Sequence, residues 1–161
     1  MVDDSASVVP RNGAPGTIRL ATEIDIARPV AEVFAYVTTP ALWHTWHPAT
    51  VSVRDVPDRP LVLGETMREL IAVAGRRSEA LWTVCACDAP SRWEISTDTT
   101  RGAAHIVYRL IAIEGGCRFQ RTLDFRSKQQ PWRALDSTFT RWVLVRQSAR
   151  ALANLKAVLE R

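Results

Sequence analysis

Apolar and polar residues alternate near the start of the chain. In residues 17–26, isoleucine or leucine occupies every second position apart from Thr22, and charged residues lie mostly between them. A period of two residues is typical of a strand with one buried face. This segment is therefore expected to be the first strand of a sheet. Residues 1–17 contain prolines, glycines and no long apolar run, and are expected to form a flexible N-terminal tail.

Two short helices are expected after this strand. Pro29 suits a first helical turn, and apolar residues follow it at helical spacing as far as residue 37. A second helical turn, over residues 42–48, carries Trp43 and Trp46 and ends at a proline.

The period then returns to two residues, and glycine- or proline-containing turn signals divide the next part of the chain. Six further strands are expected, near residues 50–55, 66–73, 77–87, 92–98, 103–113 and 117–125. Because short connections join consecutive strands, antiparallel pairing is expected throughout. The result is a seven-stranded, twisted antiparallel sheet.

A long helix is expected at the C-terminal end. Beyond Pro131 the chain lacks glycine and proline and is rich in alanine, leucine and arginine, which gives a helix on the order of 40 Å at about 1.5 Å per residue. One largely apolar stripe runs along it: Leu144, Val145, Ser148, Ala151, Leu152, Leu155, Val158 and Leu159. The expected fold class is α+β, with residues 18–161 forming a single domain whose sheet wraps around this helix.

The alternation also assigns side chains to the sheet face that the helix covers. Four aromatic residues have this inward parity: Trp82, Trp93, Tyr108 and Phe125. Glu69 and Arg121 share it and are the charged exceptions. A buried charge is costly unless it is paired. These two residues are therefore a structural ion pair, contacts for a ligand, or the sign of a slipped register.

A cavity is expected under the N-terminal half of the long helix. Extended backward, the helical stripe reaches small or polar residues: Ala134, Ser137, Thr138 and Arg141. Small side chains opposite an aromatic sheet face leave space, and a few polar groups in an apolar cleft are typical of a ligand site. The alternative is that the helix begins after Ala134, which would place these residues in a loop.

A second apolar group lies off this stripe. It consists of Trp132, Leu135, Phe139 and Trp142. An exposed apolar patch of this kind usually marks a contact. The alternatives are a homodimer interface, a lid over the cavity, and plain packing beneath the preceding loop.

Several segments resemble the START/Bet v 1-like superfamily, which includes polyketide cyclase/dehydrase and lipid-transport proteins. They are residues 24–34 (IDIARPVAEVF), 43–48 (WHTWHP), 81–84 (LWTV), 88–93 (DAPSRW) and 152–156 (LANLK). The resemblance covers about residues 18–160. It implies the helix-grip fold, in which the sheet grips the C-terminal helix. It implies no single activity, since members include carriers, hormone receptors and cyclases.

The expected function is binding of a hydrophobic or aromatic small molecule, lipid-like or polyketide-like, in the cavity. The expected contact residues are Trp46, His47, Glu69, Trp82, Trp93, Tyr108, Arg121, Phe125, Thr138 and Arg141. One alternative is an aromatic polyketide cyclase or dehydratase acting in the same cavity, and another is a protein-interaction module using the apolar patch. The candidates for acid–base chemistry are His47, Glu69, Tyr108 and Arg121, which belong to no catalytic motif.

The charge and cysteine content limit which binding partners, compartment and metal sites are expected. The net charge of +4 comes from 21 basic and 17 acidic residues without a basic cluster, so nucleic-acid binding is not expected. No segment suits a signal peptide or a membrane span, and three cysteines, an odd number, favour a reducing compartment such as the cytoplasm. Cys85 and Cys87 are expected to share a strand face, but without further ligands they predict no metal site. No other cofactor is expected.

Overall fold

The structure, a computed structural model, describes residues 7–12, 17–73, 75–100, 102–128 and 139–161. In chain order the elements are β1 (Ser7–Asn12), β2 (Thr17–Ile26), α1 (Val30–Val37), the 3-10 helix η1 (Pro40–Thr45), β3 (Thr50–Arg54), β4 (Thr66–Val73), β5 (Arg76–Asp88), β6 (Arg92–Asp98), β7 (Gly102–Ile113), β8 (Gly116–Ser127) and α3 (Phe139–Leu159). All neighbouring strands pair antiparallel, in the order β1-β2-β8-β7-β6-β5-β4-β3.

The seven strands expected from the alternation are all present, as β2 to β8. In β2 the burial follows the same period, because Leu20, Ile24 and Ile26 are buried while Arg19 and Asp25 are exposed. The turn signals therefore locate the strand ends, and the two-residue period locates the buried face.

One strand is not expected from the sequence. Residues Ser7–Asn12 lie in the expected flexible tail, but they form β1 and pair with β2, with Pro10 opposite Leu20. Proline has no backbone N–H to donate, so it is tolerated at the edge of a sheet, where one side of the strand is unpaired. The sheet therefore has eight strands.

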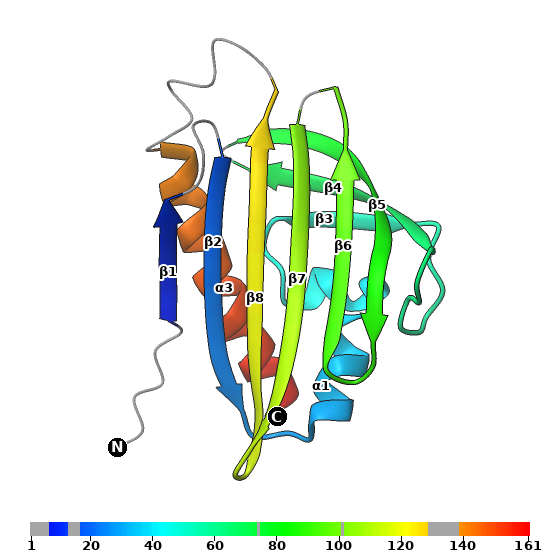
Figure 1. Cartoon of the computed structure of the whole chain (residues 1–161), viewed down its shortest axis with the longest axis vertical. Helices are drawn as coiled ribbons and strands as arrows, with labels where there is room; N and C mark the ends of the chain where they lie inside the picture. The colour runs from blue at the N-terminus through cyan, green and yellow to red at the C-terminus, as the bar shows by residue number, and fades with distance from the viewer. Residues whose placement is uncertain (1–6, 13–16, 74, 101, 129–138) are drawn as a thin grey trace.

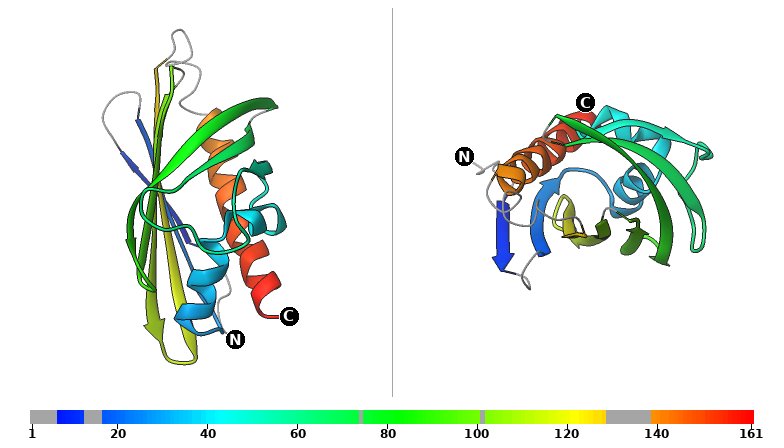
Figure 2. Two further views of the ribbon diagram at one scale, coloured as in Figure 1. Left: turned by 90° about the vertical axis from the view of Figure 1, so that its right-hand side faces the viewer. Right: turned by 90° about the horizontal axis from the view of Figure 1, so that it is seen from above.

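The sheet is strongly curled. The strands β1, β2, β8, β7 and β6 run side by side along the long axis of the molecule, whereas β3 and β4 run across them (Figure 1). Seen from above, the sheet bends around α3, with α1 and η1 on the same concave side (Figure 2). The strand β5 joins the two directions and contains a β-bulge between Val84 and Ala86, an irregularity that bends and twists a strand.

The helix α3 packs its expected stripe on the concave side. Ala151, Leu152 and Leu155 are fully buried, whereas Arg146 and Arg150 on the other side of the helix are exposed. This arrangement confirms the helix-grip fold. None of the helices in the described residues is both long and apolar enough to cross a lipid bilayer.

Side-chain hydrogen bonds hold α3 to the sheet and to the segment after η1. Gln147 Nε2 donates to the backbone oxygen of Ala72 in β4 at 3.2 Å, and Asn154 Nδ2 donates to that of Trp46 after η1 at 3.2 Å. These bonds fix the helix against β4 and against Trp46.

Candidate functional site

Two charged side chains are buried on the inner face of the sheet, the concave face toward α3. Glu69 in β4 is 3% exposed and Arg121 in β8 is 4% exposed. Their neighbours of the same parity, Met67 in β4 and Phe119 in β8, are also buried. The expected register is therefore the observed one, and a slipped strand does not explain the two charges.

Glu69 is held by two hydrogen-bond donors. Thr50 Oγ1, at the start of β3, donates to Oε1 at 2.5 Å, and Trp82 Nε1 in β5 donates to Oε2 at 2.8 Å. Burial raises the pKa of Glu69, and the Thr50 and Trp82 bonds and the charge of Arg121 oppose that rise. The carboxyl group is thus fixed in orientation by neighbours from two strands.

Arg121 has no carboxylate partner among the described residues. No carboxylate oxygen of the described residues lies within 4.0 Å of its guanidinium nitrogens, so the alternative of a direct ion pair between Glu69 and Arg121 is not observed. Its Nη1 donates to Ser148 Oγ of α3 at 3.4 Å, and its buried Nε has no hydrogen-bond partner. A buried cation with an unused donor is a costly arrangement for the protein alone.

His47 and Tyr108 lie in the same charged environment. Tyr108 is directly opposite Arg121 in the β7–β8 pair, and burial raises its pKa to about 12 although Arg121 opposes the shift. Burial and then the charge of Arg121 lower the pKa of His47 to about 3. Its Nδ1 lies 3.2 Å from Thr50 Oγ1. Both side chains are therefore uncharged at neutral pH.

Trp46 supplies a second unused donor. The residue is 1% exposed, and its buried Nε1 has no hydrogen-bond partner. Its ring packs edge to face on His47, with the ring centroids 5.4 Å apart. Indole N–H groups in protein interiors usually find an acceptor, so the free Nε1 and the free Nε of Arg121 are two donors without an acceptor in one protein core.

Trp93 belongs to the packed floor of the inner face. It is fully buried, donates from Nε1 to the backbone oxygen of Leu61 at 3.0 Å, and packs edge to face on Trp43 with centroids 6.2 Å apart. Tyr108 lies on its other side at 5.5 Å between ring centroids. The aromatic group thus supports Tyr108, and through it the region around Arg121.

At one end of the inner face, here termed the open end, several apolar side chains are only partly buried. Partly buried apolar side chains pack against the core at Ile18, Ile71, Ala104, Phe125, Leu144 and Val145. The first residues of β2, the last of β8 and the first turns of α3 meet at this end of the molecule (Figure 1). At the opposite end, Leu110, Phe119 and Leu155 are 4%, 0% and 0% exposed.

The remaining expected residues lie near that open end or outside the described part. Arg141 is half-buried in the first turn of α3, and Trp142 beside it is 55% exposed, with the Arg146 guanidinium over its ring. Thr138, together with Ala134, Ser137, Trp132 and Leu135, lies outside the described residues. The cavity under the first turns of the long helix and the apolar patch both stay predictions.

Sequence reasoning did not single out Thr50 and Ser148 as site residues. Ser148 is the one polar residue inside the buried stripe of α3, and that exception was a usable signal.

The sequence prediction that Cys85 and Cys87 share one strand face is wrong. The bulge in β5 breaks the alternation between them, so Cys87 packs against the core while Cys85 is exposed.

Comparison with known proteins agrees with this architecture. Residues 17–160 match the family described as polyketide cyclase / dehydrase and lipid transport. A START superfamily protein from Mycobacterium smegmatis has a similar structure, with a TM-score of 0.70 at 11% sequence identity over 88% of this chain and 97% of that chain. No curated protein is similar enough in sequence to count as a match.

Two other solved structures widen the comparison. A protein from Rhodobacter sphaeroides gives a TM-score of 0.69 at 17% identity, covering 96% of this chain and 98% of that chain. The di-domain ARO/CYC BexL from the BE-7585A biosynthetic pathway gives a TM-score of 0.68 at 17% identity, covering 92% of this chain and 52% of that chain. At these identities the likeness concerns the fold alone.

Proposed function

Because this chain belongs to the polyketide cyclase / dehydrase and lipid transport family, we propose that it binds a hydrophobic or aromatic small molecule between the inner face of the sheet and α3. The molecule carries an acidic or other hydrogen-bond-accepting group. This group contacts Arg121 and Trp46, and the apolar part extends toward the open end of the inner face.

The observation that carries the proposal is the buried cation on the inner face, which has no counter-charge among the described residues. Arg121 is 4% exposed, its Nε lacks a hydrogen-bond partner, and no described carboxylate forms an ion pair with it. Removing a guanidinium from water without a counter-charge is costly. A ligand carboxylate or enolate would supply both the counter-charge and an acceptor for Nε.

The apolar side chains at the open end supply the rest of a binding site. Phe125, Leu144 and Val145 are only partly buried although they face the core. Small-molecule sites are mostly apolar with a few placed polar groups, and this end of the inner face has that composition. A lipid-like or polyketide-like molecule suits it, and the protein would then act as a carrier or a sensor.

The direction of the pKa shifts of the site residues favours binding over catalysis. A general acid or base works best with a pKa near the working pH. The pKa of His47 is lowered to about 3 and that of Tyr108 is raised to about 12, so both move away from neutrality. Only Glu69 moves toward it, and both of its oxygens already accept hydrogen bonds.

An aromatic polyketide cyclase or dehydratase is the second candidate, and the raised pKa of Glu69 is the observation in its favour. An enzyme of this kind would convert a poly-β-keto substrate. Glu69→Gln should then abolish the conversion but leave binding of the substrate intact. Binding without conversion supports the carrier or sensor.

We also propose that the protein acts in the cytoplasm, because the free cysteines of the described residues suit its reducing conditions.

The test is a pair of ligands that differ only in the end group. Displacement of the fluorescent dye 1-anilinonaphthalene-8-sulfonate by myristic acid and by myristyl alcohol measures the affinity for each. In Arg121→Met the affinity for the acid is expected to fall by about tenfold or more, since a hydrogen bond to a charged group contributes about 1.5–3 kcal/mol. The affinity for the alcohol should change much less.

Arg109→Met is the matched control, because Arg109 is an exposed arginine of β7. The same substitution there should leave both affinities unchanged. The Arg121→Met protein should fold, since replacing a buried charge with an apolar side chain of similar volume is often neutral or stabilising. Equal effects of the two substitutions, or no displacement of the dye by either ligand, would disprove the proposal.

A further inference from the structure

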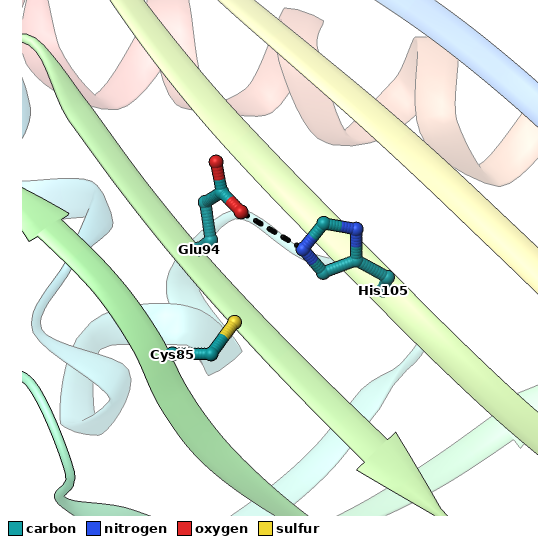
Figure 3. Close-up of side chains that lie close together, drawn as sticks. All are labelled: Cys85, Glu94 and His105. Atoms are coloured by element: carbon teal, nitrogen blue, oxygen red, sulfur yellow. Dashed lines mark hydrogen bonds and ion pairs between the residues drawn. The ribbon is translucent and has the colours of Figure 1, made fainter.

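The outer, convex face of the sheet carries three side chains that can ligate a metal. Cys85 in β5, Glu94 in β6 and His105 in β7 come from three adjacent strands, and one ligand atom of each lies within 4.8 Å of the others. In Figure 3 the Cys85 sulfur, the Glu94 carboxylate and one His105 ring nitrogen point toward a common point. This cluster lies on the opposite side of the sheet from Arg121.

The strand register explains why these residues meet. His105 is opposite Ser96 in the β6–β7 pair, so Glu94, two residues before Ser96, lies diagonally next to His105 on the same face. In β5, Val84 pairs with Ile95 and Ala86 pairs with Glu94, which leaves Cys85 as the extra residue of the bulge. Bulges redirect side chains, and here the extra residue lies beside Glu94.

The carboxylate of this cluster is held in place. Glu94 is 7% exposed although it is on the outer face. Arg92 Nε donates to its Oε1 at 2.5 Å, and His105 Nε2 lies 3.0 Å from its Oε2. Arg92 thus occupies one carboxylate oxygen and leaves the other beside the imidazole. Groups that orient a ligand in this way strengthen metal sites.

We propose that Cys85, Glu94 and His105 bind one Zn²⁺ ion, with water as the fourth ligand. Thiolate, imidazole and carboxylate are the ligands that zinc takes in proteins, and three protein ligands plus water is a common zinc arrangement. Mg²⁺ and Ca²⁺ prefer oxygen ligands alone, so the sulfur and nitrogen select against them.

The distances are compatible with zinc after a small movement. Ligand atoms around a tetrahedral zinc lie about 3.5 Å apart, given metal–ligand distances of about 2.0–2.3 Å. The three ligand atoms lie within 4.8 Å of one another, so the cluster must contract to hold the ion. Cys85 is exposed, so rotation of its side chain can bring the sulfur to the other two ligands. The ion takes the place of the thiol proton and of the His105–Glu94 contact.

The experiment is a metal titration of the full chain, reduced and freed of metal beforehand. Zinc affinity is measured by competition with a chromophoric chelator, and Co²⁺ replaces zinc for spectroscopy. One zinc per chain is expected, and the cobalt form should show a sulfur-to-cobalt charge-transfer band. Cys85→Ser and His105→Gln should each weaken zinc binding at least about tenfold, since even residues that only support a ligand contribute that much.

Cys87→Ser is the matched control, because Cys87 lies two residues away in β5 but packs against the core. It should leave zinc affinity and the cobalt spectrum unchanged. The proposal is overturned if Cys85→Ser keeps the wild-type zinc affinity, if Cys87→Ser weakens it equally, or if the cobalt spectrum lacks the sulfur band. Circular dichroism of each variant verifies that it has folded. Because Cys85 and His105 are not among the residues around Arg121, lipid binding and zinc binding can fail independently.

Discussion

At the scale of single residues, the proton affinity of His47 follows from where the fold places it. The residue is half-buried, and burial together with the charge of Arg121 lowers its pKa to about 3 from an ordinary value of 6.5. Between these two pH values the unfolded chain binds a proton at His47 and the folded chain does not. By linkage, the free energy of unfolding therefore rises with pH across this window.

The first prediction concerns this pH dependence. Between pH 3 and 6.5 the wild-type protein should lose stability on acidification more steeply than His47→Gln, by up to about 1.4 kcal/mol per pH unit. Glu69 has a raised pKa and acts in the opposite direction, but it is present in both proteins and cancels in the comparison. Urea denaturation at a series of pH values gives both slopes.

His44→Gln makes the same substitution at an exposed position of η1 and is the control. Its slope should match the wild type. Parallel slopes for wild type and His47→Gln would contradict the lowered pKa of His47.

The second prediction compares how strongly Glu69 is coupled to Trp82 and to Arg121. Trp82→Phe removes the donor to Oε2 and should destabilise the fold by about 1–3 kcal/mol, because a buried acceptor is left unsatisfied. In double-mutant cycles with Glu69→Gln, the coupling of Glu69 to Trp82 should be about 0.5–3 kcal/mol. The coupling to Arg121 should be smaller, since no ion pair joins them. A larger coupling to Arg121 would contradict the described contacts.

Strand parity was sufficient to predict that Glu69 and Arg121 are buried on one face. It could not predict their partners. Thr50 reaches Glu69 from β3, and Ser148 reaches Arg121 from α3, and both contacts depend on how distant elements pack. The cluster of Cys85, Glu94 and His105 was missed for a similar reason, because the alternation assigns each residue to the outer face but does not give the register between the three strands.

At the scale of elements, the third prediction tests the buried side of α3. Leu155 is fully buried against the sheet. Leu155→Ala should lower the free energy of unfolding by about 2–5 kcal/mol, because it removes a large side chain from a packed core. Leu63→Ala is the same substitution at a leucine that is 64% exposed, and it should cost less than about 0.5 kcal/mol. Similar losses in urea denaturation would show that another face of the helix is packed.

A fourth prediction concerns the hairpin between β7 and β8. A Cβ atom at Gly116 would lie 2.1 Å from the backbone oxygen of Ile26 at the end of β2. Gly116→Ala must therefore push two backbone segments apart and should cost about 1–3 kcal/mol. A thermal unfolding temperature equal to that of the wild type would contradict this close approach.

The elements that the sequence predicts are those with a local signal. Turn residues and the two-residue period locate β2 to β8 because each strand has one buried face. The strand β1 has no such signal, since Ser7–Asn12 is short and contains a proline. It pairs at the edge through backbone hydrogen bonds, which depend little on side-chain type.

At the scale of the whole molecule, the sheet is curled but not closed. Its edge strands are β1 and β3, which are not neighbours in the strand order. An unpaired strand edge can pair with another chain, and proline in an edge strand discourages this because it offers no N–H. β1 pairs with β2 and so covers the edge of β2. Because Pro10 lies in β1, the edge of β1 that stays unpaired is itself a poor partner for another strand.

The last prediction removes that cover. Deletion of residues 1–12 exposes the edge of β2 along the register in which Ser7 to Asn12 pair with Glu23 to Ile18. The free energy of unfolding should fall by about 1–3 kcal/mol, since cross-strand pairs contribute about 0.2–1 kcal/mol each and ordering the strand costs part of that gain. Self-association should increase with protein concentration, because β2 is longer than β1 and lacks proline. Deletion of residues 1–6, which leaves β1 intact, is the control. Urea denaturation and sedimentation velocity measure the two effects, and a 1–12 deletion as stable and as monomeric as the control would mean that β1 does not protect this edge.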